Sequence, residues 1–147
     1  MVGQFLLLGL IAVFGVQHIP AVTLDGSFEQ VVLAVGIAEL AIGAWALFSA
    51  FLALGPNLTP LPRPSERSSL VRSGIYARVR HPIYAGLMLA GIGWATATRS
   101  LPAFAAAVVL CLFMDAKARR EEAWLVERYP DYATYRLGTR RFLPGVY

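Results

Sequence analysis

The side chains best suited to chemistry lie in two short polar clusters on either side of a long apolar stretch. The first cluster, residues 68–84, ends in Arg-His-Pro-Ile-Tyr, and the second, residues 117–122, reads Lys-Ala-Arg-Arg-Glu-Glu. His81 can act as a hydrogen-bond partner or as a base, and the carboxylate of Glu121 or Glu122 can hold an ammonium group or a pair of hydroxyls. Together the clusters suit a polar, partly cationic small molecule.

Aromatic residues in the first cluster strengthen this interpretation. Tyr76 and Tyr84 could face a cation, since cations are attracted to aromatic rings. Pro82 fits the first position of a helix, which places Tyr84 in the first turn, close to unpaired backbone donors. A structural interpretation stays open: the Arg-His pair is also a common interfacial anchor, and Glu121 and Glu122 could pair with basic residues on a solvated helix face.

The composition places both clusters in a membrane protein. Of 147 residues, 57% are hydrophobic and 15% are charged, against roughly 45–50% and 25% in globular proteins. The mean hydropathy is +0.59, and the apolar residues form long runs of the kind that cross a bilayer. We therefore expect one all-α integral membrane domain over residues 1–147, whose first run is retained as a span because it lacks the basic start of a signal peptide.

Four apolar runs are predicted to be transmembrane helices, at about residues 2–22, 29–54, 83–98 and 101–114. Between the second and third runs lies a cytoplasmic loop, residues 55–82, whose repeated prolines favour extended backbone at first. An amphipathic cytoplasmic tail, residues 115–147, begins as a continuation of the fourth helix.

The connection between the last two runs determines where the polar clusters lie. Only Arg99 and Ser100 separate these runs, which predicts a short helical hairpin. Because a short hairpin brings its two ends together, His81 and Tyr84 are expected to lie close to Glu121.

The distribution of charge orients the chain. No Lys or Arg precedes Arg63, whereas the loop before the third run and the tail are rich in both. By the positive-inside rule the loop, the tail and the active site face the cytoplasm, with Arg99 at the hairpin tip as the exception. The basic charge is thus a topology signal rather than a sign of nucleic-acid binding. The single Cys111 excludes an internal disulfide and a cysteine-cluster metal site, and we expect no metal.

One acidic residue lies inside an apolar run. Glu39 shares a helix face with Gly36 and Gly43, and an intramembrane acid is a functional hypothesis by default. Close helix packing is the alternative, which we favour. The third run carries its own stripe of small residues: Gly86, Ala90, Gly93 and Ala97.

The order and spacing of the motifs carry a family likeness. They are Gly-Ile-Tyr-x-x-x-Arg-His-Pro-x-Tyr-x-Gly at 74–86, a helical hairpin, Glu-Glu-x-x-Leu at 121–125, Arg-Tyr at 128–129, Tyr-x-x-Tyr at 132–135 and Phe-Leu-Pro at 142–144. Over about residues 45–144, this set resembles the isoprenylcysteine carboxyl methyltransferase family, and more loosely the phospholipid N-methyltransferases.

The resemblance implies S-adenosylmethionine as the cofactor, held by the segments that bracket the hairpin. It assigns cofactor contacts to Ser68, Ser69, Leu70, Val71, Tyr76, His81, Pro82, Ile83, Tyr84, Glu121 and Glu122. It also implies a basic residue about one turn before the glutamate pair that meets the substrate carboxylate. Lys117 stands there, where the family favours Arg, and we group Arg80 with it as a catalytic candidate.

The predicted function is S-adenosylmethionine-dependent methyl transfer in the membrane to a lipophilic small molecule, lipid or prenylated substrate, in the first instance onto a carboxylate. Three alternatives stay open: a phospholipid N-methyltransferase, an NADPH-dependent sterol- or steroid-type reductase, which shares the Arg-His-Pro-x-Tyr segment, and a non-catalytic membrane protein with the same fold. The Glu-Glu-x-x-Leu segment and the small size favour methyl transfer over reduction.

Overall fold

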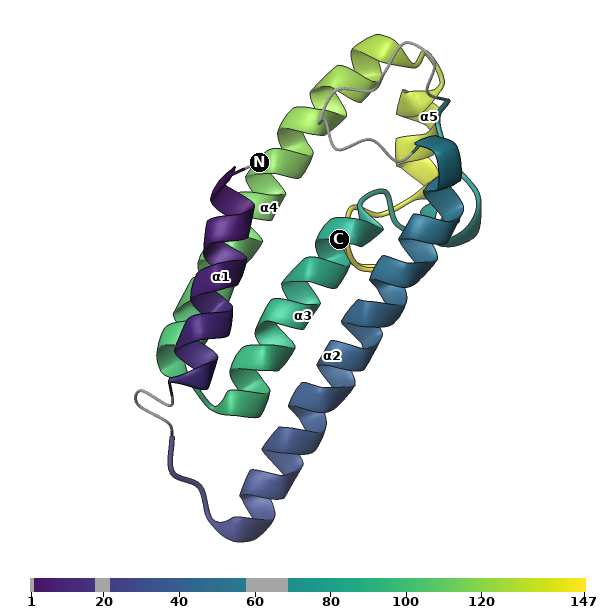
Figure 1. Ribbon diagram of the computed structural model, residues 1–147. Coiled ribbons are helices and arrows are strands. Elements are labelled where there is room, and N and C mark those ends of the chain that lie inside the picture. The colour runs from purple at the N-terminus through teal and green to yellow at the C-terminus, as the bar shows by residue number, and fades with distance from the viewer. Residues whose placement is uncertain (1, 18–21, 58–68) are drawn as a thin grey trace. The chain divides into compact units, whose positions relative to one another are not determined.

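The computed structural model describes residues 2–17, 22–57 and 69–147. Within these ranges the regular elements are helices, and there is also one isolated β-bridge, between Val79 and Arg140. Figure 1 shows α1 (Val2–Val16), α2 (Gly26–Leu54), α3 (Pro82–Thr98), α4 (Leu101–Arg128) and α5 (Tyr132–Gly138), with short 3-10 helices at Gly55–Asn57 and Gly74–Ala77. The predicted all-α class is confirmed.

The chain divides into two compact units. Unit 1 contains Met1–Trp45 and Gly86–Met114, and unit 2 contains Ala46–Ala85 and Asp115–Tyr147. Unit 1 is therefore built from the apolar helices, whereas unit 2 collects both polar clusters and the tail.

The helix boundaries agree with the sequence in part. The third helix begins at Pro82, and the fourth continues past Met114, as predicted, and ends at Arg128. The first helix was predicted to reach residue 22, but α1 ends at Val16, and residues 18–21 of the predicted span lie outside the described residues. Helix α2 begins at Gly26, three residues earlier than predicted.

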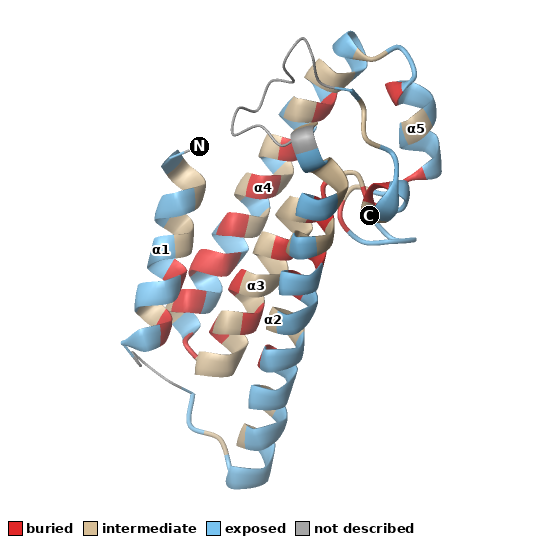
Figure 2. Ribbon diagram, turned by 45° about the vertical axis from the view of Figure 1, so that its right-hand side comes forward, coloured by how far each residue is buried: buried red, intermediate tan, exposed pale blue. Residues whose placement is uncertain are grey.

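Two of the described helices, α2 and α4, are long and apolar enough to cross a membrane. Helix α1, with 15 residues, is shorter than the roughly 20 residues that span a bilayer core of about 30 Å. Figure 2 shows that most of α2 is exposed, and its exposed side chains are large and apolar, with Trp45 at 63%, Phe48 at 64% and Leu52 at 67%. Such a surface is suited to lipid rather than to water.

Small residues allow the helices of unit 1 to pack closely. A Cβ atom added at Gly36 would lie 2.5 Å from the backbone nitrogen of Ala97, and one added at Gly93 would lie 2.8 Å from that of Leu40 and 2.9 Å from the Cβ of Glu39. The small residues predicted as a packing stripe on α3 therefore do lie against α2. The contact with Gly93 supports the packing interpretation of Glu39.

A tight turn joins α3 to α4. Arg99 adopts a φ of 55°, and the buried Ser100 hydroxyl donates to the carbonyl of Phe14 at 2.9 Å. The guanidinium of Arg99 pairs with Glu29 at 2.7 Å. Arg99, the exception to the predicted charge asymmetry, is thus paired with an acidic residue of the same unit.

Candidate functional site

The candidate site lies in unit 2, where the C-terminal segment is hydrogen-bonded to the residues that precede α3. The N–H of Arg80 donates to the carbonyl of Arg140 at 2.8 Å, the N–H of His81 donates to that of Arg141 at 3.0 Å, and the N–H of Arg140 donates to that of Arg78 at 3.1 Å. The start of α3 is therefore held by a segment about 60 residues further along the chain.

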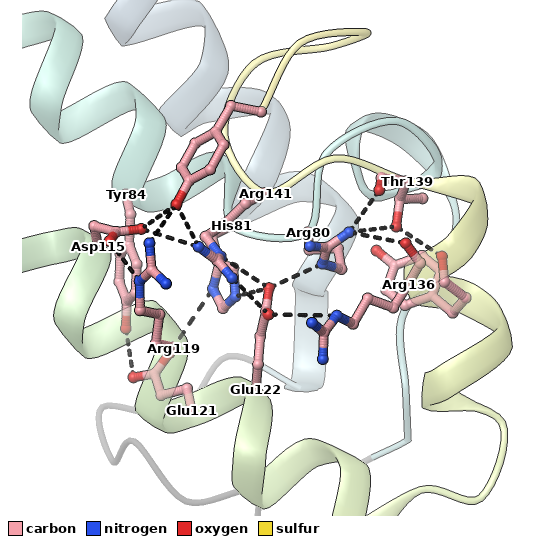
Figure 3. Close-up of polar contacts among 12 residues, drawn as sticks. Arg80, His81, Tyr84, Asp115, Arg119, Glu121, Glu122, Arg136, Thr139 and Arg141 are labelled. Atoms are coloured by element: carbon pink, nitrogen blue, oxygen red, sulfur yellow. Dashed lines mark hydrogen bonds and ion pairs between the residues drawn. The ribbon is translucent and has the colours of Figure 1, made fainter.

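The two ends of the hairpin meet as the sequence predicted. Figure 3 shows the Tyr84 hydroxyl donating to the Glu121 carboxylate. The His81 ring lies between the glutamates, with Nδ1 3.9 Å from Glu121 Oε2 and Nε2 3.4 Å from Glu122 Oε1. His81 is buried, and its Nε2 has no hydrogen-bond partner among the described residues. The prediction that His81, Tyr84 and Glu121 lie together is confirmed by this geometry.

Glu122 lies at the centre of a buried cluster of cations. Its carboxylate accepts a hydrogen bond from Arg80 Nε at 2.9 Å and two from Arg141, through Nε at 3.3 Å and Nη2 at 3.1 Å. Only 4% of the Glu122 side chain and 8% of the Arg80 side chain are exposed. A buried charge needs such partners, and both carboxylate oxygens of Glu122 accept hydrogen bonds from arginines of the protein itself. Among the described residues, Glu121 makes polar contacts with Tyr84 and His81.

The catalytic candidate Arg80 is also held internally. Besides Glu122, its guanidinium donates to the carbonyls of Thr139 and Arg136. Arg80 thus ties the start of α3 to α4 and to the end of α5 (Figure 3).

Among the described residues, two groups contact the ring of Tyr84. The His81 ring stacks on it with centroids 5.4 Å apart and an interplanar angle of 11°. The ammonium nitrogen of Lys117, the other catalytic candidate, lies 4.8 Å from the ring centroid. A cation at this distance from an aromatic face is attracted to it.

Tyr76 lies in the 3-10 helix before α3 and is buried. Its carbonyl accepts a hydrogen bond from the Tyr135 hydroxyl at 2.6 Å. Burial raises the pKa of Tyr76 above its ordinary value, and the neighbouring Tyr135 adds to this shift. Burial also raises the pKa of Tyr135 to about 12. Both phenols are therefore neutral at physiological pH.

The remaining cofactor candidates lie in two places. Pro82 is buried and Ile83 is half-buried in the first turn of α3. The N–H of Ser69 donates to Asn57 Oδ1 at 3.1 Å, and Leu70 and Val71 follow, both half-buried. Within the described chain, no hydrogen bond or ion pair joins these three residues to the Glu121 group, and Ser68 lies outside the described residues.

Sequence reasoning missed a second polar group beside the first. Asp115 accepts hydrogen bonds from Arg119 Nε at 2.7 Å, from Arg141 Nη1 at 3.0 Å and from the Tyr147 hydroxyl at 3.0 Å. The available signal was that Asp115 and Glu122 stand seven residues apart, on one face of a helix. Arg141 had instead been interpreted only as part of the topology signal.

The fold of this chain is similar to one that has been solved. It resembles the eukaryotic intramembrane Ras methyltransferase ICMT (isoprenylcysteine carboxyl methyltransferase), with a TM-score of 0.71 and 24% sequence identity, over 78% of this chain and 43% of that chain. At this identity the likeness shows a common fold.

The sequence places the chain within a family. Residues 31–132 match the phospholipid methyltransferase family. The matched stretch contains both polar clusters, residues 68–84 and 117–122. The chain therefore belongs to the phospholipid methyltransferase family, and the relationship predicted from its motifs is confirmed.

A curated relative is the cobalt-zinc-cadmium resistance protein CzcN of Cupriavidus metallidurans. It is 34% identical over 80 residues, which make up 54% of this chain and 37% of that protein. The chain thus spans less than half the length of both this relative and ICMT.

Proposed function

We propose that this chain is an S-adenosylmethionine-dependent methyltransferase of the membrane that acts on a lipophilic acceptor. The observation that carries the proposal is the convergence of His81, Tyr84 and Glu121 from the two ends of the hairpin, in a chain of the phospholipid methyltransferase family. The proposed topology has four spans, with the active site on the arginine-rich, cytoplasmic side.

The residues present fit the cofactor. Glu121 offers carboxylate oxygens for an ammonium group or ribose hydroxyls. The buried His81 Nε2 lies 3.4 Å from Glu122 Oε1 without a well-aligned hydrogen bond to the described residues. The contact of Lys117 with Tyr84 supports a place for a cation at this ring. We assign direct cofactor contacts first to Glu121, His81 and Tyr84, with Pro82 and Ile83 beside them.

The other cofactor candidates are assigned more peripheral roles. Tyr76 and residues 68–71 border the same end of α3 in sequence, and we propose that they enclose the adenosine. Glu122, whose oxygens are held by Arg80 and Arg141, supports the cofactor site from behind.

The chemistry asks the protein chiefly for alignment. When bound, S-adenosylmethionine supplies a methyl group on a sulfonium, which a carboxylate attacks directly without a base. Lys117 would attract the acceptor carboxylate, and holding both reactants in line can contribute several kcal/mol of rate enhancement. Arg80 would contribute by fixing His81 and the start of α3 rather than by touching the acceptor.

A phospholipid amine is the second candidate acceptor, and the family match favours it. An amine must lose a proton before or during transfer, for which His81 or Glu121 is the candidate base. Family membership also favours methyl transfer over the NADPH-dependent reductase and over a non-catalytic membrane protein.

Binding of S-adenosylmethionine to purified protein, measured by calorimetry, tests the proposal. We expect Tyr84→Phe to weaken binding by roughly tenfold, the worth of one hydrogen bond to a charged group, and Glu121→Gln to weaken it further. Glu127→Gln, an exposed glutamate on the same helix, is the matched control and should bind normally. Folded wild-type protein that does not bind the cofactor would refute the proposal.

The acceptor is identified by labelled methyl transfer into membrane extracts. A methyl ester is released by mild base, whereas an N-methyl group is retained. Base-labile label supports a carboxylate acceptor, and base-stable label in a phospholipid supports the amine.

A further inference from the structure

Arg141 links two acidic residues of α4 that no other described side chain joins. Asp115 and Glu122 are seven residues apart, so they lie on one face of the helix about 10 Å apart along its axis. Nη1 of Arg141 donates to Asp115 at 3.0 Å, while Nη2 and Nε donate to Glu122 at 3.1 and 3.3 Å. Only 11% of the Arg141 side chain is exposed, so most of it is enclosed by the site.

The same residue also holds His81. The Arg141 carbonyl accepts the His81 N–H at 3.0 Å, and the Glu122 carboxylate that Arg141 fixes lies 3.4 Å from His81 Nε2. His81 is thus constrained by Arg141 along two paths, one through the backbone and one through Glu122. Figure 3 shows Arg141 beside His81, on the side of the site next to Asp115.

We propose that Arg141 is a positioning residue for the cofactor site: it acts through Glu122 and His81 and makes the C-terminal segment part of that site. This inference rests on the proposed function. The role requires a guanidinium, because its planar fork donates in several fixed directions at once, whereas a lysine ammonium is a compact charge that cannot reach both acids.

The first test compares Arg141→Lys with Arg140→Lys, its exposed neighbour. Both variants keep the net charge. Arg141→Lys should weaken S-adenosylmethionine binding roughly 10–100-fold, the range found when residues that support metal ligands are replaced, and should raise KM for the cofactor more than it lowers kcat. Arg140→Lys should bind as the wild type. Wild-type affinity in Arg141→Lys overturns the inference.

A double-mutant cycle separates positioning from a general loss of structure. If Arg141 acts through Glu122, then Arg141→Lys has little further effect on cofactor affinity in a Glu122→Gln background. Additive losses would mean that the two residues act independently, which contradicts the proposal.

Asp115→Asn provides a second route if Arg141→Lys does not fold. It removes the negative charge at the far end of Arg141, where Nη1 keeps the Tyr147 hydroxyl as an acceptor, and it does not touch Glu122. It should weaken cofactor binding in the same direction. Asp131→Asn, which disturbs only an exposed pair with Arg72, is the control, and equal affinities in these two variants would overturn the inference. Failure of the wild type itself to bind the cofactor would refute the proposed function instead, so the two failures are distinguishable.

Discussion

Glu122→Gln is expected to damage the fold more than any other single change in the glutamate pair. The substitution keeps the size of the side chain but removes the negative charge between Arg80 and Arg141. Removing one partner of a buried ion pair usually costs about 3–5 kcal/mol. Here Arg80 keeps the Thr139 carbonyl and Arg141 keeps Asp115, so we expect the lower end, about 3 kcal/mol.

Thermal unfolding of the purified protein measures this loss. For a chain of this size each kcal/mol corresponds to about 2–4 °C in Tm, so Glu122→Gln should lower Tm by roughly 6–12 °C. Glu121→Gln removes the acceptor of one hydrogen bond from Tyr84 and should cost about 1 kcal/mol. Glu127→Gln, which is exposed, should stay within about 0.5 kcal/mol of the wild type.

The variants of the two glutamates should also differ in which measurement they affect, cofactor binding or thermal unfolding. Glu121→Gln is expected to lose cofactor affinity while it stays folded, and Glu122→Gln to lose stability first. Equal Tm values for the two variants, or an unchanged Tm in Glu122→Gln, would refute the assignment of Glu122 as the buried centre of the cluster.

Two further predictions concern packing and pH. Gly36→Ala should destabilise unit 1 by about 1–3 kcal/mol, because its Cβ would meet the backbone of Ala97. Gly9→Ala, where a Cβ meets nothing within 4 Å, should be neutral or slightly stabilising in the same thermal assay. Equal effects of the two substitutions would contradict the packing of Gly36 against Ala97. The pKa of Tyr135 is raised from 10.0 to about 12 in the folded protein, so its contribution to stability is complete below pH 10 and is lost as pH rises through 12. Unfolding followed against pH should show this alkaline loss, and Tyr135→Phe should show a smaller one; an identical profile would contradict it.

The meeting of His81, Tyr84 and Glu121 could be predicted because it depends on local facts. Only Arg99 and Ser100 separate two apolar helices, so the second helix of the pair runs back alongside the first. Pro82 fixes where the third helix begins. Both features act over a few residues and are visible in the sequence.

The role of Arg141 could not be predicted because it depends on contacts between distant segments. The bridge between Val79 and Arg140 joins residues that no local pattern relates, and without it Arg141 is one of many basic residues in the tail. The end of α1 at Val16 was missed for a different reason: the apolar residues at positions 19, 21 and 22 were counted with the first apolar run.

The adjacent glutamates show how one short motif can serve two purposes. Successive residues of an α-helix point about 100° apart, so Glu121 and Glu122 face largely different neighbours. Glu121 points to the first turn of α3, where it meets Tyr84, and Glu122 points to the C-terminal segment, where it meets Arg141. Helix α4 therefore places Glu121, which is proposed to hold the cofactor, next to Glu122, which anchors the C-terminal segment. The ring of His81 lies beside both glutamates and so connects the two sides of this pair.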